Sequence, residues 1–255
     1  MTGKFRPRGG AFYTLGLGLV CALLGGLGGW YWQSRQIGVG AGGHFAERDR
    51  VAIEQLVHDY LVEHPEVLPE AMDALTRKQD AMRLAGLRDV LEQATAGTVL
   101  GNPQGKITLV EFADYACGYC RHSVEDVEAL IAANPDLRVV VRELPILSPE
   151  SADAAKMAIA AAQQGRYAAF HKAMYAASRP DAQSIAAAAR AAGLDMAQAR
   201  KTIAAPATEQ ELVRNMDIAK RLGFSGTPSW VVGDSLMTGA VGREQLAKAI
   251  ADARS

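Results

Sequence analysis

Cysteine is scarce in this chain of 255 residues, which contains only three of them. Small exported domains held together by a disulfide framework use cysteine far more densely, so that class of protein is excluded. Charge of one sign is not in excess either, because 27 Lys and Arg face 28 Asp and Glu, for a formal net charge of −1. Without a basic excess, nothing in the composition points to nucleic acid as a partner.

Two of the three cysteines, Cys117 and Cys120, are separated by Gly118 and Tyr119. The apolar run ITLVEF before them predicts a buried strand, and the segment after them predicts an amphipathic helix. A C-x-x-C pair at such a strand-to-helix turn is a redox-active dithiol motif. The first thiol lies at the helix N-terminus, where free N–H groups and the helix dipole favour the thiolate. The second is close enough to attack a mixed disulfide and release the substrate.

A structural zinc site is an alternative to a redox pair, because C-x-x-C also supplies half of many such sites. Zinc in a structural site takes four ligands. The third cysteine, Cys21, lies far away in an apolar segment, and His122 and His171 are isolated in the sequence. The ligand count therefore argues against zinc, and we expect neither a metal nor a cofactor.

The first 34 residues predict a membrane anchor. Lys4, Arg6 and Arg8 precede an uncharged apolar stretch that ends in the aromatic cluster WYW. An apolar run of about 20 residues is long enough to cross a bilayer, and such aromatic residues are enriched at the membrane interface. A cleaved signal peptide is the alternative. In both cases the basic end stays inside and the rest of the chain is exported.

Residues 35–97 predict a Gly-rich tether followed by a helical stem. Apolar residues recur with helical spacing over 46–61 and over about 66–94, and the pair His64-Pro65 interrupts the pattern. These helices have too few large apolar residues to form a core of their own. Their apolar stripe predicts either a simple spacer or an oligomerising stem, in which the chain forms a homodimer or homotrimer.

Residues 98–255 predict an α/β domain. The strand before the C-x-x-C helix and a second, β-branched run, LRVVVREL, imply a parallel βαβ unit. Alanine-rich helical segments occupy about 148–222, with expected breaks at Gly165, Pro180, Gly193 and Pro206. Residues 229–238 predict a β-hairpin before a last helix at 241–253. This order of elements is that of a thioredoxin fold with an α-helical insertion.

Three stretches of this domain resemble the DsbA/DsbC/DsbG-like exported thiol–disulfide oxidoreductases, and most of all the ScsC-type proteins. They are VEFADYACGYC at 110–120, ELPIL at 143–147 and GTPSW at 226–230, and the stem segment EHPEVL is similar too. Together with the apolar N-terminal stretch, the resemblance predicts an enzyme anchored in the inner membrane by a single span, with its catalytic domain in the periplasm. It further implies cysteine-containing protein substrates and a membrane redox partner of the DsbD/ScsB or DsbB kind.

The position of the thiols and the resemblance together assign roles to individual residues. Cys117, at the start of the helix, is the expected nucleophile, and Cys120 is the expected resolving thiol. The resemblance implies that Thr227 and Pro228 form a cis-proline loop that faces the cysteines and pairs with an extended substrate segment. It also implies that Glu111 is a partly buried carboxylate that handles the proton of Cys120. The alternative for Glu111 is an exposed position at the edge of the sheet.

The direction of the reaction follows from the residues around the thiols. Gly118 and Tyr119 are expected to tune the redox potential and to contact substrate. Gly-Tyr between the cysteines and threonine before the proline resemble the isomerase DsbC rather than the oxidase DsbA. We therefore predict an isomerase or reductase. A dithiol oxidase is one alternative, and a tethered module that binds copper through the two thiols is another, since soft thiolates suit Cu(I).

Overall fold

The computed structural model describes residues 47–93 and 97–254. The expected membrane anchor and most of the tether therefore lie outside the described residues. In the described ranges, no helix is both long and apolar enough to cross a membrane. By its packing the chain divides into two units, the first ending at Leu68 and the second beginning at Pro69.

Two helices form the predicted stem. They are α2 (Glu47–Glu63) and α3 (Val67–Leu84), and the break between them contains Pro65, as the sequence predicts. α3 ends ten residues before the expected end at residue 94, because the chain turns at Gly86, whose φ of 76° is a left-handed conformation. A short helix, α4 (Arg88–Glu92), follows this turn.

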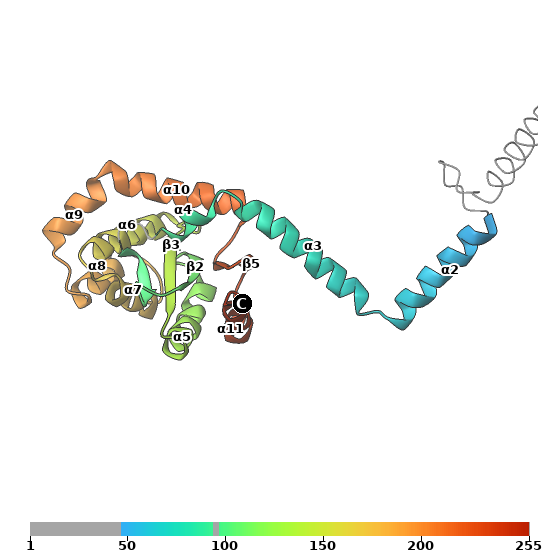
Figure 1. Cartoon of the computed structure of the whole chain (residues 1–255). Coiled ribbons are helices and arrows are strands. Elements are labelled where there is room, and N and C mark those ends of the chain that lie inside the picture. The colour runs from blue at the N-terminus through green and yellow to red at the C-terminus, as the bar shows by residue number, and fades with distance from the viewer. Residues whose placement is uncertain (1–46, 94–96, 255) are drawn as a thin grey trace, which may run out of the picture. The chain divides into compact units, whose positions relative to one another are not determined.

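A five-stranded mixed sheet in the order β1-β3-β2-β4-β5 forms the centre of the second unit (Figure 1). Its strands are β1 (Val99–Gly101), β2 (Ile107–Ala113), β3 (Leu137–Glu143), β4 (Ser229–Val232) and β5 (Ser235–Thr238). β2 and β3 are parallel and are joined through α5 (Gly118–Ala133), which confirms the predicted βαβ unit. β4 and β5 form the predicted hairpin. The edge strand β1, antiparallel to β3, is not predicted by the sequence pattern.

The predicted helical insertion lies between β3 and β4. It consists of α6 (Pro149–Gln163), α7 (Tyr167–Ala176), α8 (Ala182–Ala191), α9 (Met196–Ala204) and α10 (Pro206–Leu222). The helices are interrupted where the sequence predicts, since Gly165 and Gly193 have positive φ and Pro206 is the first residue of α10. After the hairpin, α11 (Gly242–Asp252) is the last helix. The thioredoxin fold with a helical insertion is thus confirmed.

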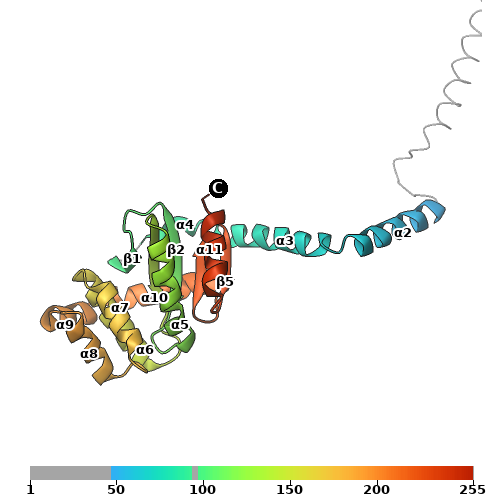
Figure 2. The same ribbon diagram turned by 90° about the horizontal axis from the view of Figure 1, so that it is seen from below.

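Helices cover both faces of the sheet. The face with Leu109, Val139 and Trp230 packs with residues of α5, α6, α7 and α11. Figure 2 shows α5 and α11 side by side over the sheet, and the two helices are in contact. The opposite face, with Val110 and Phe112, packs with residues of α10 and α4. The first of these faces carries the residues of the candidate site.

The end of the stem packs against the sheet. Leu84, Leu87 and Leu91 are each at most 2% exposed and belong to the core on the α10 side. Arg142 of β3, which is also buried, donates a hydrogen bond to the main-chain oxygen of Leu91 (3.0 Å) and pairs with Glu211 of α10 (3.2 Å). The expected domain boundary at residue 98 therefore lies inside a packed region.

Candidate active site

The end of β2 and the start of α5 bring the two thiols together. Cys117 is the N-cap residue of α5, and its Sγ accepts a hydrogen bond from the main-chain N–H of Cys120 (3.4 Å). Both residues are free cysteines, and Cys117 is 4% exposed whereas Cys120 is fully buried. A sulfur at this position faces the free N–H groups and the positive end of the helix dipole at the helix start.

The loop before β4 brings Thr227 and Pro228 to the same place, 110 residues further along the chain. The Thr227–Pro228 peptide bond is cis, as the resemblance implies. The Sγ of Cys117 donates to the main-chain oxygen of Thr227 at 3.2 Å. The two motifs therefore form one site, in which the main chain before the proline lies next to the first sulfur.

Asp114 fixes the turn between β2 and α5. Its buried carboxylate accepts N–H bonds from Ala116 (2.8 Å) and from Ile146 and Leu147 in the loop after β3 (2.8 and 2.9 Å). The turn that carries Cys117 is thereby tied to the loop of the neighbouring strand. We did not predict this role from the sequence, although a short acidic residue directly after an apolar strand is a typical turn signal.

We expect Asp114→Asn to destabilise the protein by about 2–3 kcal/mol, because hydrogen bonds to a charged acceptor are stronger than neutral ones and an amide directs an N–H group at one of the donors. Urea unfolding would measure this change. Asp153→Asn is the control, since Asp153 is exposed on α6. Equal stability of the two variants would show that Asp114 does not hold the turn.

Glu111 is buried in the middle of β2, so the alternative of an exposed edge position is wrong. It is 3% exposed, and burial raises the pKa of its carboxyl group to about 8. Its carboxyl group has no hydrogen bond from the part of the chain that the structure describes. Burial and then the charge of Glu111 raise the pKa of the Cys120 thiol well above its ordinary value. The carboxyl group and the second thiol therefore influence each other's ionisation.

A second buried carboxyl group, Glu143, lies on β3 and faces the same side of the sheet. Its Oε1 accepts hydrogen bonds from the hydroxyls of Tyr115 (3.1 Å) and Tyr167 (2.8 Å). Burial raises the pKa of Glu143 to about 8, although the two tyrosine hydrogen bonds act in the opposite direction. The Nδ1 of His171 lies 3.4 Å from the Tyr115 hydroxyl, and burial lowers the pKa of this histidine to about 4. Helical spacing in the sequence predicts core packing for Tyr167, but no local pattern predicts this cluster.

The residues between the thiols differ in exposure. Tyr119 is 69% exposed, so its ring is available to a bound chain. A Cβ atom added to Gly118 would meet no other atom within 4 Å, so this position is open as well. The Nδ1 of His122 lies 2.7 Å from the main-chain oxygen of Gly118, so this histidine is hydrogen-bonded within its own helix.

Metal ligands do not gather in residues 47–93 and 97–254, where no group of three or more His, Cys, Asp or Glu side chains is arranged to hold an ion. What the site does contain is a nearly buried sulfur at a helix start, a second sulfur behind it, and a buried carboxyl group. This arrangement is suited to disulfide exchange.

A family model described as the DSBA-like thioredoxin domain matches residues 108–251. The chain belongs to this family. A second model, described as the N-terminal domain of the copper resistance protein ScsC, matches residues 49–81 in the stem. The protein is therefore a protein thiol–disulfide oxidoreductase of the DsbA/ScsC type, as its sequence predicts.

Solved structures of this family resemble the chain over most of their own length. A thioredoxin-like oxidoreductase from Silicibacter pomeroyi is 43% identical, with a TM-score of 0.63 over 66% of this chain and 97% of the other. The thiol-disulfide exchange protein alpha-DsbA2 from Wolbachia pipientis is 27% identical, with a TM-score of 0.64 over 69% and 96%. A linker-deletion mutant of Proteus mirabilis ScsC is 26% identical, with a TM-score of 0.63 over 84% and 99%.

A curated relative is a longer protein. The Na(+)/H(+) antiporter NhaA 3 of Salinispora tropica is 29% identical over 160 residues, which are 61% of this chain. The chain spans 24% of the length of that antiporter. The chain therefore matches nearly the whole length of the solved structures above, but only a small part of the antiporter.

Proposed function

We propose that this protein rearranges or reduces disulfides in exported proteins, with Cys117 as the nucleophile and Cys120 as the resolving thiol. The observation that carries the proposal is the position of the Cys117 sulfur, which lies between the N–H of Cys120 and the main-chain oxygen of Thr227. A nucleophile needs access to substrate, and Cys117 is the less buried of the two. A resolving thiol needs only to reach the first sulfur.

The reaction begins when the Cys117 thiolate attacks one sulfur of a substrate disulfide. A new S–S bond forms between enzyme and substrate, and the other substrate sulfur leaves as a thiolate. In isomerisation, that or another substrate thiolate attacks the mixed disulfide and restores Cys117. In reduction, Cys120 loses its proton and attacks Cys117, which releases the reduced substrate and oxidises the enzyme pair. A membrane electron donor then returns two electrons to the enzyme.

Glu111 takes the proton of Cys120 in the reductive step. A proton acceptor works best when its pKa lies near the working pH, and burial brings that of Glu111 to about 8. The group is therefore mostly protonated at neutral pH, with a minor ionised fraction that acts as the base. Coupling between Glu111 and Cys120 supports this role.

Substrate binds beside the loop of Thr227 and Pro228. The main chain of this loop lies next to the first sulfur, and an extended peptide can pair with such a main chain as an added strand. Tyr119 supplies an exposed ring next to the nucleophile, while Gly118 leaves room for the approaching chain. This mode of binding depends on the substrate backbone and thus accepts many proteins.

The redox state of the thiol pair in the cell distinguishes an isomerase or reductase from an oxidase. We expect thiol trapping to find Cys117 and Cys120 mostly reduced, and the purified protein to refold a scrambled disulfide substrate. A mostly oxidised pair would support the oxidase alternative, which rests on the same site. Copper bound in proportion to protein after purification without reductant would support the copper-binding alternative.

The catalytic domain works in the periplasm, and the N-terminal segment anchors the chain in the inner membrane. The periplasm provides the disulfides on which such an enzyme acts. A protein of this kind in Salmonella enterica is described as a periplasmic thioredoxin-like protein, at 26% identity. The membrane redox partner is an electron donor of the DsbD/ScsB kind if the pair is kept reduced, or an electron acceptor of the DsbB kind if the pair is kept oxidised.

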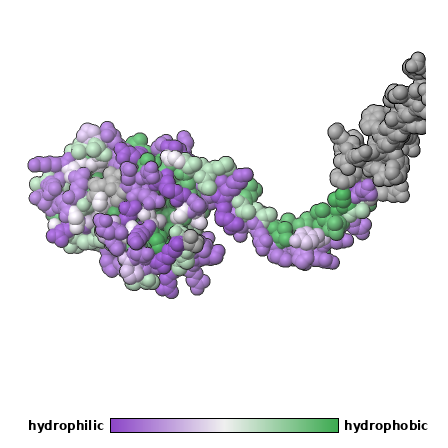
Figure 3. Space-filling model, viewed as in Figure 1, coloured by the Kyte–Doolittle hydropathy of each residue, from purple (hydrophilic) through white to green (hydrophobic). Residues whose placement is uncertain are grey.

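The stem assembles the chain into a homodimer or homotrimer. Apolar side chains are exposed along α2 and α3, and Figure 3 shows several of them gathered there. Leu56, Val57 and Tyr60 of α2 are 68%, 50% and 51% exposed. Burial of each large apolar side chain contributes about 1.5–3 kcal/mol, so a helix with this surface gains from pairing with its copies.

We expect Leu56→Ser, Val57→Ser and Tyr60→Ser together to convert an oligomer of the full-length chain into a monomer, because they remove the apolar surface of α2. Light scattering would measure the mass. Asp49→Asn with Asp59→Asn is the matched control, since both residues are exposed on the same helix. A wild-type protein with the mass of one chain would contradict the proposed assembly and favour a simple spacer.

A further inference from the structure

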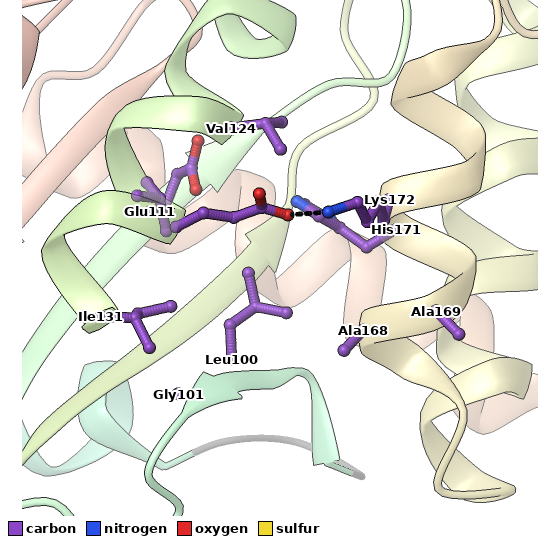
Figure 4. A pocket seen from close by; sticks show the side chains of 11 residues that line it. Leu100, Gly101, Glu111, Val124, Ile131, Ala168, Ala169, His171 and Lys172 are labelled. Atoms are coloured by element: carbon purple, nitrogen blue, oxygen red, sulfur yellow. Dashed lines mark hydrogen bonds and ion pairs between the residues drawn. The ribbon is translucent and has the colours of Figure 1, made fainter. Parts of the chain in front are cut away.

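A cavity of about 350 Å³ lies between α5, α7 and β1, on the face of the sheet that carries Glu111 (Figure 4). Its walls are mostly apolar, and they consist of Leu100, Val124, Val127, Ile131, Ala168 and Ala169. The volume is within the range of about 300–1,000 Å³ that is typical of small-molecule sites. The cavity is separate from the surface around Cys117 and Thr227, since neither residue lines it.

The polar groups of the cavity lie at its two ends. Glu111 of β2 and His171 of α7 line it, and both are buried. At the exposed end, the Nζ of Lys172 and the Oε1 of Glu128 form an ion pair of 2.8 Å that links α7 to α5, drawn as the dashed line in Figure 4. This pair carries no net charge. The cavity therefore has a neutral rim, apolar walls and a buried carboxyl group without a hydrogen-bond partner in the described chain.

We propose that this cavity binds a small, uncharged and mainly apolar molecule, whose carbonyl or ether oxygen accepts a hydrogen bond from the carboxyl group of Glu111. Apolar pockets with a few convergent polar groups are the usual form of ligand sites. The carboxyl group of Glu111 lines the cavity, so a ligand oxygen can take the place of solvent beside it. A charged ligand is disfavoured, because its charge would lose its hydration among the apolar walls.

The protonation state of Glu111 agrees with such a ligand. Burial raises its pKa to about 8, so at neutral pH the group is a hydroxyl donor rather than a carboxylate. His171 is neutral at the same pH, because burial lowers its pKa to about 4. All groups at the inner end are therefore uncharged, and they match a ketone, ester or ether rather than an acid or an amine.

Occupancy of the cavity regulates the active site, a consequence that rests on the proposed role of Glu111 in disulfide exchange. A hydrogen bond to the protonated form of an acid favours that form. With the ligand bound, Glu111 accepts the proton of Cys120 less readily, and the reductive step slows. The cavity thus offers a means of inhibition that leaves the substrate-binding surface free.

The test is a titration of the full-length protein with 2-heptanone, followed by NMR of ¹³C-labelled methyl groups. We expect saturable shifts confined to the methyls of Leu100, Val124, Val127 and Ile131, and no such shifts with heptanoate. Binding does not require exchange activity, so a failure of the proposed function would leave this readout intact. Absence of saturable shifts, or equal shifts with heptanoate, would overturn the proposal.

Two pairs of variants locate the ligand. Ala168→Phe places a ring at the rim and should weaken binding at least about tenfold, which corresponds to about 1.4 kcal/mol, whereas Ala187→Phe on the exposed side of α8 should not. Glu111→Gln keeps a donor and should bind within a few-fold of wild type. Glu111→Leu lacks a donor and should lose about tenfold. Equal binding by Gln and Leu variants would show that Glu111 does not contact the ligand.

Discussion

Cys117→Ser is expected to abolish disulfide exchange, measured as insulin reduction and as refolding of a scrambled disulfide substrate. A serine hydroxyl cannot form the mixed disulfide through which exchange proceeds. Cys120→Ala should instead accumulate mixed disulfides, because the first sulfur still attacks but nothing resolves the complex. Such complexes would appear on non-reducing gels and disappear with added thiol.

His122→Ala is the control for both cysteine variants, since His122 is exposed on the same helix and its Nδ1 is hydrogen-bonded within that helix. We expect it to retain most of the activity. The roles of the two thiols can also be measured directly, because an alkylating reagent at pH 7 should modify Cys117 faster than Cys120. Faster modification of Cys120 would reverse the assignment of nucleophile and resolving thiol.

A large effect on stability is expected from Glu111 and follows pH. Burial raises its folded-state pKa to about 8 from an ordinary 4.5. Stability from the protonated group is fully present below pH 4.5 and is lost as pH rises through 8. A tenfold change in proton affinity is about 1.4 kcal/mol, so the loss amounts to up to about 5 kcal/mol at alkaline pH.

Glu111→Gln should remove this loss, because an amide does not ionise. We expect the variant to unfold at a similar urea concentration to wild type near pH 4.5 and at a clearly higher one near pH 9. It should also exchange disulfides more slowly, since Cys120 loses its proton acceptor. Glu125→Gln, at an exposed position of α5, should follow the wild-type pH profile. Identical profiles for the Glu111 variant and wild type would refute a buried titrating carboxyl.

The fold was predictable where local signals are strong. The apolar runs indicate the main strands. Most breaks of the helical insertion are indicated by Gly165, Gly193 and Pro206. The edge strand β1 has only three residues and depends on pairing with β3, so no local pattern predicts it. The early end of α3 depends on a left-handed turn at Gly86. The apolar pattern continues past this glycine, so the sequence predicts a longer helix.

The candidate site was predictable only where its residues form a local motif. Cys117 and Cys120 form a local motif, whereas their proximity to Thr227 arises only from the pairing of β2 with β4 and could be expected only by resemblance. Glu143 and its tyrosine partners come from three separate segments, namely β3, α7 and the turn before α5. Hydrogen bonds between such distant residues leave no periodic signal in a single sequence.

The hydrogen bonds that Asp114 accepts hold the turn of the thiols but do not depend on the side chains of the loop after β3. On the loop after β3, the carboxylate contacts the main-chain N–H groups of Ile146 and Leu147, whose own side chains are 43% and 53% exposed. Every amino acid except proline has such an N–H group. Mutation can therefore change the outer surface of this loop while the bonds that hold the turn of the thiols stay the same.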